Sequence, residues 1–166
     1  MQNTLIISTG GTFNKIYNPL NGELIIDKSS EAVKRIAKLW LCKLHTISII
    51  GKDSLEMTEE DRELLYQTII DSDYERIVII HGTDTMDVTA KYLAKKIVNR
   101  KVVNKSIVLT GAMVPYSIDP IEATANLCSA LGYVKMLESH DIYIVMNGVF
   151  DRYDKVKKNR DVGKFI

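Results

Sequence analysis

The sequence has few cysteines, almost no net charge and no long apolar run, and each absence narrows the range of functions. Cys42 and Cys128 are the only cysteines and lack the spacing of a metal site, so we interpret both as buried, reduced thiols in helical segments. The net charge of +1 offers no basic surface for nucleic acid. The first apolar stretch, residues 5–7, is too short for a signal peptide or a membrane span. We therefore expect a cytoplasmic protein with neither a membrane nor a nucleic acid as partner.

Length and composition indicate one domain with a substantial core. The chain has 166 residues, which is enough for one such core and too few for two ordinary domains. Hydrophobic residues make up 46% and charged residues 26%, as in soluble globular enzymes and unlike disordered chains. We expect a single domain over residues 1–166.

Five apolar runs alternate with helical patterns along the chain. The runs cover residues 4–8, 44–50, 76–80, 106–110 and 142–146, and each is typical of a strand buried on both faces. This alternation predicts an α/β fold, a doubly wound and mainly parallel sheet with helices on both faces, of the flavodoxin-like or Rossmann-like kind. Ligands of such folds bind at the carboxyl ends of the strands.

Three polar residues mark expected helix starts. Ser30 precedes apolar residues at helical spacing, and Thr58 with Asp61 resembles a capping box. Asp119 precedes Pro120, which suits the first position of a long, alanine-rich helix.

One segment interrupts the alternation directly after the first strand. Between Phe13 and Ile26, turn residues are flanked by strand formers, a pattern typical of a β-hairpin. Because this segment follows Thr12, we predict a hairpin lid over a site at that strand end.

Polar turns follow four of the expected strands. Because the carboxyl ends of parallel strands meet at one edge of a sheet, these turns predict a single site. Glycines in them allow sharp turns and a close approach to a ligand. The turns are Gly11-Thr12, Asp53-Ser54, Thr83-Asp84 and Thr110-Gly111.

The two threonines, Thr12 and Thr83, are candidate nucleophiles. A threonine hydroxyl needs an adjacent base, and Asp84 and Lys105 are candidates, since a buried lysine with a lowered pKa can take a proton. Turn amides after the glycines can stabilise an oxyanion. Acyl transfer without metal or cofactor is the chemistry that these groups favour, although threonines in turns also serve as helix caps.

Two other features receive a plainer interpretation. The basic segment 155–160 is typical of a solvated stretch of chain. His81 ends a strand, and we interpret it as a packed, hydrogen-bonded neighbour of the following turn rather than as a base.

Three motifs follow one another along the chain. They are Thr9-Gly10-Gly11-Thr12, His81-Gly82-Thr83-Asp84-Thr85-Met86, and Leu109-Thr110-Gly111-Ala112-Met113 together with the preceding Lys105. In this order they resemble the bacterial-type L-asparaginases, and the resemblance extends over almost the whole chain. It implies the fold of that family's N-terminal domain and hydrolysis of the side-chain amide of asparagine, glutamine or a related small amide to the acid and ammonia, without cofactor or metal.

The resemblance also implies roles for individual residues. Thr12 is the implied nucleophile, and Thr83, Asp84 and Lys105 form a second catalytic group. Ser54 would hold the α-carboxylate of the substrate and Asp84 its α-amino group. The implied substrate-binding residues are Gly11, Asp53, Ser54, Thr83, Asp84 and Ala112.

Parts of the family pattern are replaced or missing. Tyr17 is the nearest candidate for the lid tyrosine, in a hairpin of different sequence, and Val114 stands where the family usually has arginine. Family members continue into a smaller C-terminal domain, and a neighbouring subunit's C-terminal domain lends an acidic residue to the substrate's amino group. We expect this domain to be absent after Ile166, and a homodimer or homotetramer is implied only by the analogy.

Two other functions remain open at this point. One is a non-catalytic module of the same fold that binds an amino acid or a partner. The other is an asparaginase-like subunit of a tRNA-dependent amidotransferase, which needs partner chains.

Overall fold

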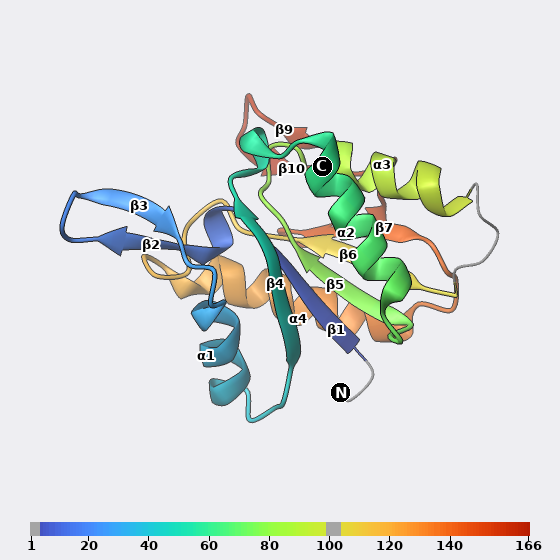
Figure 1. Ribbon diagram of the computed structural model, residues 1–166, viewed down its shortest axis with the longest axis horizontal. Helices are drawn as coiled ribbons and strands as arrows, with labels where there is room; N and C mark the ends of the chain where they lie inside the picture. Colours follow the sequence, from blue (N-terminus) through green and yellow to red (C-terminus); the bar gives the residue numbers. More distant parts are fainter. Residues whose placement is uncertain (1–3, 99–103) are drawn as a thin grey trace.

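A six-stranded sheet forms the centre of the computed structural model, which describes residues 4–98 and 104–166 (Figure 1). The strand order is β4-β1-β5-β6-β7-β8, in which all neighbours pair in parallel except β7 and β8. This order confirms the predicted doubly wound, mainly parallel α/β fold. The strands are β1 (Thr4–Gly10), β4 (His45–Lys52), β5 (Arg76–Ile80), β6 (Ser106–Thr110), β7 (Ile142–Met146) and β8 (Val149–Arg152).

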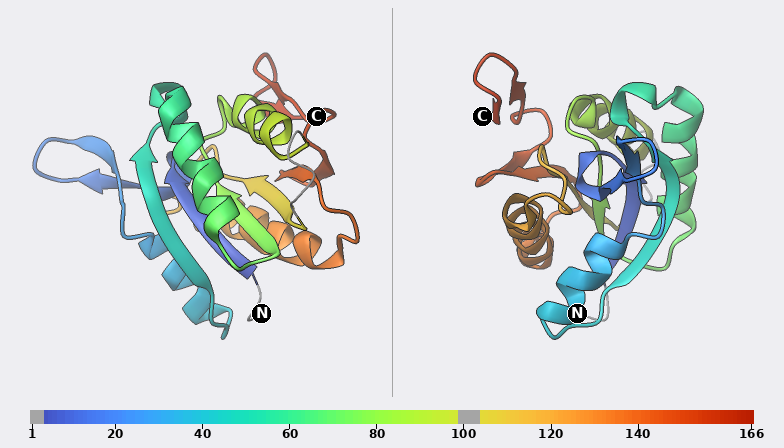
Figure 2. Two further views of the ribbon diagram at one scale, coloured as in Figure 1. Left: turned by 45° about the vertical axis from the view of Figure 1, so that its right-hand side comes forward. Right: turned by 90° about the vertical axis from the view of Figure 1, so that its left-hand side faces the viewer.

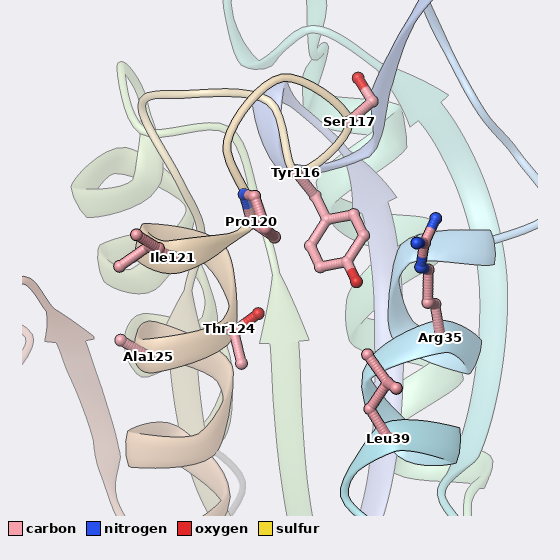
Figure 3. A pocket seen from close by; sticks show the side chains of 8 residues that line it. All are labelled: Arg35, Leu39, Tyr116, Ser117, Pro120, Ile121, Thr124 and Ala125. Atoms are coloured by element: carbon pink, nitrogen blue, oxygen red, sulfur yellow. The ribbon is translucent and has the colours of Figure 1, made fainter.

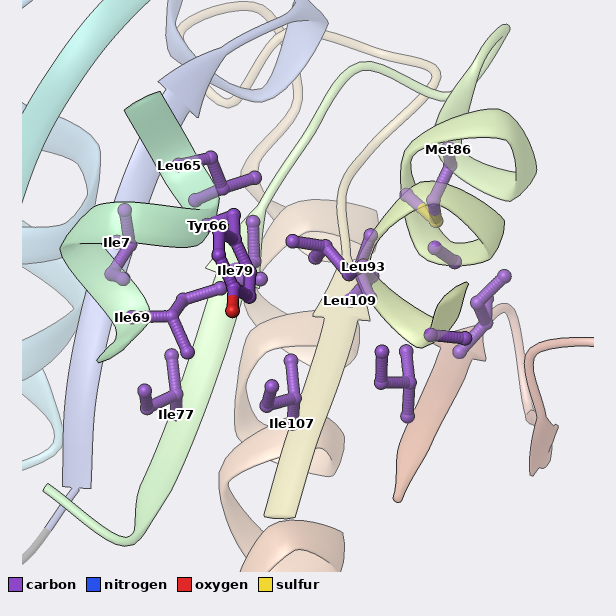
Figure 4. Close-up of a cluster of buried hydrophobic side chains, with 14 of the residues drawn as sticks. Ile7, Leu65, Tyr66, Ile69, Ile77, Ile79, Met86, Leu93, Ile107 and Leu109 are labelled. Atoms are coloured by element: carbon purple, nitrogen blue, oxygen red, sulfur yellow. The ribbon is translucent and has the colours of Figure 1, made fainter. Parts of the chain in front are cut away.

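Helices cover both faces of the sheet, as the two views in Figure 2 show. On one face, α2 (Glu59–Asp71) and α3 (Met86–Val98) pack over one set of alternating strand residues (Figure 4). On the other face, α1 (Glu31–Leu39) and α4 (Pro120–Met136) pack over the other set. Because successive strand residues point to opposite faces, the continuous apolar runs supply both layers of core.

Several short elements lie beyond the carboxyl edge of the sheet. The hairpin of β2 (Lys15–Asn18) and β3 (Glu23–Ile26) pairs antiparallel as predicted and projects from the body of the fold (Figure 1). A second antiparallel pair, β9 (Lys158–Asn159) and β10 (Lys164–Phe165), lies near the end of the chain. Two single 3-10 turns, η1 (Thr12–Asn14) and η2 (Ser54–Glu56), directly follow the loops after β1 and β4.

Two of the three predicted helix starts are confirmed in detail. Thr58 and Asp61 form a reciprocal capping box at the start of α2, and the carboxylate of Asp119 accepts a hydrogen bond from Ile121 N. The prediction for Ser30 is wrong about the cap. Ser30 has φ 55° and no capping bond, while Asp27 accepts the backbone N–H of Glu31 at 2.8 Å.

The interpretation of the cysteines is corrected in part. Cys128 lies in α4, but Cys42 follows the end of α1 outside any helix. Both are free thiols and only partly buried.

Within residues 4–98 and 104–166, no helix is long and apolar enough to cross a membrane.

Candidate active site

The turns that carry Thr12 and Thr83 lie against each other at the carboxyl edge of the sheet. Gly11 has φ 75°, and a Cβ at this position would lie 2.5 Å from Cα of Gly82. Any side chain there would collide with main-chain atoms of the second turn. The two glycines therefore allow the two threonines to stand on adjoining turns, as the sequence predicts.

The loop after β4 packs against the Thr83 turn. A Cβ at Gly82 would lie 2.6 Å from Cβ of Ser54, and Thr85 Oγ1 donates a hydrogen bond to the Ser54 carbonyl at 2.8 Å. The Ser54 side chain is buried, and its hydroxyl has no hydrogen-bond partner among the described residues. A buried hydroxyl without a partner is costly, so Ser54 is poised to bond to a ligand.

A lysine close to the end of the chain completes the group around Thr83. Lys158 Nζ donates hydrogen bonds to Thr83 Oγ1 at 2.8 Å and to Asp84 Oδ1 at 2.9 Å. Its side chain is only 19% exposed, and Arg160 also lies close, at 3.8 Å from Asp84 Oδ1. The interpretation of residues 155–160 as a purely solvated stretch is therefore wrong for Lys158.

The prediction that Lys105 joins Thr83 and Asp84 is wrong. Lys105 precedes β6 at the amino edge of the sheet, and its ammonium donates to the carbonyls of Ser72 at 2.6 Å and Tyr74 at 2.8 Å. Burial lowers the pKa of this lysine, but the acceptors are main-chain oxygens. A strand of five residues separates this edge from the carboxyl edge, roughly 13 Å away.

An open cleft of about 610 Å³ lies above these turns and is bordered by the hairpin. Lys15 Nζ crosses it to Asp53 Oδ2 at 2.7 Å, and this bond holds the pKa of the Asp53 carboxyl below its ordinary value. The cleft combines polar groups with apolar hairpin residues, as a site for a small polar molecule requires. Its lining is Thr12, Lys15, Leu24, Ile25, Ile26, Lys28, Gly51, Asp53, Leu55, Glu56 and Asp84.

Two further predicted site residues lie away from the cleft. Tyr17 is 61% exposed on the hairpin, and its hydroxyl lies 3.9 Å from where a Cβ of Gly22 would be, so its ring lies over the hairpin turn. Ala112 is fully buried in the hydrophobic cluster that also contains Phe13. Neither side chain is part of the cleft lining, and nor are Gly11, Ser54 and Thr83, which lie within the adjoining turns.

His81 supports the Thr83 turn from below, as its sequence position indicates. The ring is fully buried, its Nδ1 lies 2.7 Å from the Gly82 carbonyl, and its Nε2 has no partner among the described residues. Burial lowers the pKa of His81 to about 4, so the ring is neutral at physiological pH.

Within the described part of the chain, no group of three or more metal-binding side chains is assembled.

The sequence of this chain is similar to those of known proteins. The family model "Asparaginase, N-terminal" matches residues 3–163. The chain belongs to the asparaginase family. It is 28% identical to an L-asparaginase of Thermococcus kodakarensis over 79% of this chain and 40% of that protein. It is 30% identical to L-asparaginase 1 of Escherichia coli K12 over 64% of this chain and 31% of that protein.

Solved structures of asparaginases have the same fold. A structure titled as a probable cytoplasmic L-asparaginase from Campylobacter jejuni superposes with a TM-score of 0.77 at 26% identity, covering 98% of this chain and 52% of that one. The chain therefore spans about half or less of the length of these relatives.

For an asparaginase domain, the side chain that the sequence failed to reveal is Lys158. It lies in β9, a strand of only two residues that follows β8 and contains no apolar run. Its only signal was the basic cluster of residues 155–160, and such clusters are usually solvated.

Proposed function

We propose that this chain hydrolyses the side-chain amide of L-asparagine to aspartate and ammonia, with glutamine or a related small amide as a second substrate. The observation that carries the proposal is the contact of Lys158 Nζ with both Thr83 Oγ1 and Asp84 Oδ1, directly beside the Thr12 turn. A candidate nucleophile, a second hydroxyl, a lysine and a carboxylate then stand in one place.

Thr12 is the proposed nucleophile, because its hydroxyl lines the open cleft whereas that of Thr83 is buried and bonded to Lys158. Thr12 Oγ attacks the amide carbon, and turn amides hold the oxyanion. The hydroxyl proton passes to the leaving nitrogen, which departs as ammonia and leaves an ester on Thr12. Water then cleaves this ester to the free carboxylic acid and restores the hydroxyl.

Thr83, Lys158 and Asp84 are proposed to transfer protons in these steps. The Lys158 bond to Thr83 Oγ1 leaves the hydroxyl hydrogen of Thr83 free to bond elsewhere, and the Asp84 carboxylate stabilises positive charge on the lysine. Lys105 has no part in this proposal.

Substrate recognition is proposed to use the groups around Ser54. Its hydroxyl, which has no partner among the described residues, suits the α-carboxylate, and Asp84 suits the α-amino group. Asp53 acts indirectly through its bond to Lys15, and the Gly11 main chain borders the reacting amide. We further propose a cytoplasmic location and a single domain over residues 1–166, while a homodimer or homotetramer rests on analogy with the family.

Ammonia release from L-asparagine by the purified protein tests the proposal. We expect turnover, and we expect Thr12→Ala and Thr83→Ala each to lower kcat at least about 100-fold. Thr68→Ala is the matched control, because that hydroxyl bonds only to the Leu64 carbonyl on the exposed side of α2. No ammonia from asparagine or glutamine, together with calorimetric binding of aspartate, would contradict the proposal and favour the non-catalytic module.

A further inference from the structure

A second open groove lies between α1 and α4, apart from the catalytic cleft. It has a volume of about 580 Å³, and its lining shares no described residue with that of the cleft. Arg35 and Leu39 of α1 lie opposite Pro120 and Thr124 of α4, Tyr116 lies between the two helices, and Ile121 points away from α1 (Figure 3). This volume is within the usual range for small-molecule sites.

Much of the groove is apolar surface open to solvent. Leu39, on the α1 side of the groove, is 73% exposed, and Pro120, on the α4 side, is also exposed. Tyr116 adds the face of a half-buried aromatic ring. A ligand with an apolar body would remove this surface from water, which is favourable in proportion to the area covered.

Three polar groups in the groove have no protein partner among residues 4–98 and 104–166. They are the guanidinium of Arg35, the hydroxyl of Tyr116 and the hydroxyl of Thr124. Figure 3 shows the Tyr116 ring in the space between the helices and the Arg35 side chain extending along α1. Groups of this kind fix the position of a ligand in an otherwise apolar site.

Arg35 forms no ion pair within residues 4–98 and 104–166, and the nearby carboxylates have other contacts. The Glu31 carboxylate lies 3.9 Å from Lys34 Nζ. The Asp27 carboxylate accepts the N–H groups of Ser29 and Glu31, each at 2.8 Å. Arg35 therefore presents an unpaired fork of N–H donors, the geometry that matches a carboxylate.

We infer that this groove is a binding site for a small carboxylate with an apolar tail. The carboxylate bonds to Arg35 and to the Tyr116 hydroxyl, and the tail lies along Leu39 and Pro120. This inference does not depend on the proposed hydrolysis, because the site and its ligand are different.

The probe for this site is 3-phenylpropionate, studied by isothermal titration calorimetry with the purified protein. We expect saturable binding at one site. The neutral 3-phenylpropan-1-ol lacks the charge and acetate lacks the tail, so each is expected to bind at least about tenfold more weakly. Trp40, the only tryptophan in the chain, follows Leu39 and gives an independent fluorescence signal for binding.

Substitutions then assign the binding to the groove. Arg35→Gln is expected to weaken the binding of 3-phenylpropionate about tenfold, and Arg35→Lys less. Lys38→Gln is the matched control on the same helix, because it removes one positive charge outside the groove. Hydrogen exchange is expected to slow on binding in residues 31–41 and 116–125 and not in residues 81–90.

Three results would overturn the inference. They are no saturable binding at about 10 mM probe, equal binding of the acid and the alcohol, and equal losses for Arg35→Gln and Lys38→Gln. None of these results bears on ammonia release, so the inference and the proposed hydrolysis fail separately.

Discussion

Two half-buried lysines lie at opposite edges of the same sheet, and their partners differ in kind. At the amino edge, Lys105 donates to main-chain carbonyls of Ser72 and Tyr74. At the carboxyl edge, Lys158 donates to the hydroxyl of Thr83 and the carboxylate of Asp84. Carbonyl oxygens neither titrate nor react, whereas a hydroxyl and a carboxylate do both. Partial burial of a lysine therefore does not locate a reactive site, but the chemistry of its partners does.

The largest expected effect is on the rate of ammonia release, for which we expect Lys158 to matter and Lys105 not to matter. Lys158→Met should lower kcat for ammonia release about 100-fold to 1,000-fold, because proton transfer through Thr83 loses its partner. Lys105→Met should leave kcat within about twofold, because its ammonium touches no group of the cleft. Steady-state kinetics with asparagine measures both, and equal losses would break the comparison.

The second effect concerns the pH dependence of stability at the carboxyl edge. Folding keeps His81 neutral down to about pH 4, whereas in the unfolded chain its pKa is the ordinary 6.5. Protons therefore bind the unfolded state first as the pH falls, and the free energy of unfolding decreases between pH 6.5 and 4. This group contributes at most about 3 kcal/mol to that loss.

Urea unfolding between pH 7.5 and 4 measures the decrease, and NMR titration of the His81 ring identifies its source. A ring that protonates near its ordinary pKa of 6.5 in the folded protein would contradict the expectation.

The third effect concerns stability, for which we expect Lys105 to matter more than Lys158. Lys105→Met should reduce the free energy of unfolding by about 2 kcal/mol, because two carbonyls lose a charged donor. Lys158→Met should cost less, because Asp84 lines the open cleft and keeps Arg160 at 3.8 Å. Denaturant midpoints of the two variants give the comparison, and a less stable Lys158→Met protein would refute it.

The smallest effect compares two helix starts. Thr58→Ala should cost about 1 kcal/mol, because it removes a capping box that the structure forms. Ser30→Ala should change stability by less than about 0.5 kcal/mol, because its hydroxyl makes no capping bond. Thermal unfolding of both variants decides this, and a similar loss in each would mean that Ser30 acts through the unfolded state.

The fold was predictable because apolar runs define buried parallel strands. The predicted limits of the strands at residues 76–80, 106–110 and 142–146 match the structure at both ends. The two remaining strands extend further than their apolar residues, because Gly10 and Lys52 continue the ladder. Polar residues that pair only through their main chain leave no such pattern in the sequence.

The site was predictable where motifs follow long strands and not where they depend on short ones. Thr12, Ser54 and Thr83 follow β1, β4 and β5, so the order of the sheet brings them together. Lys105 could have been set aside from its position before a strand, since both ends of that strand cannot lie at one edge. Lys158 reaches the site through a two-residue strand, whose place depends on tertiary contacts.

The contact between Gly11 and Gly82 has a consequence for altering substrate preference. It joins main chain to main chain across β1 and β5, which are adjacent strands of the sheet. The relative placement of the two threonine turns thus follows from a close approach of main chain to main chain and not from any replaceable side chain. Accommodating a longer amide is therefore expected to require reshaping the hairpin or the Asp53 loop, because neither glycine can be substituted without moving the two turns apart.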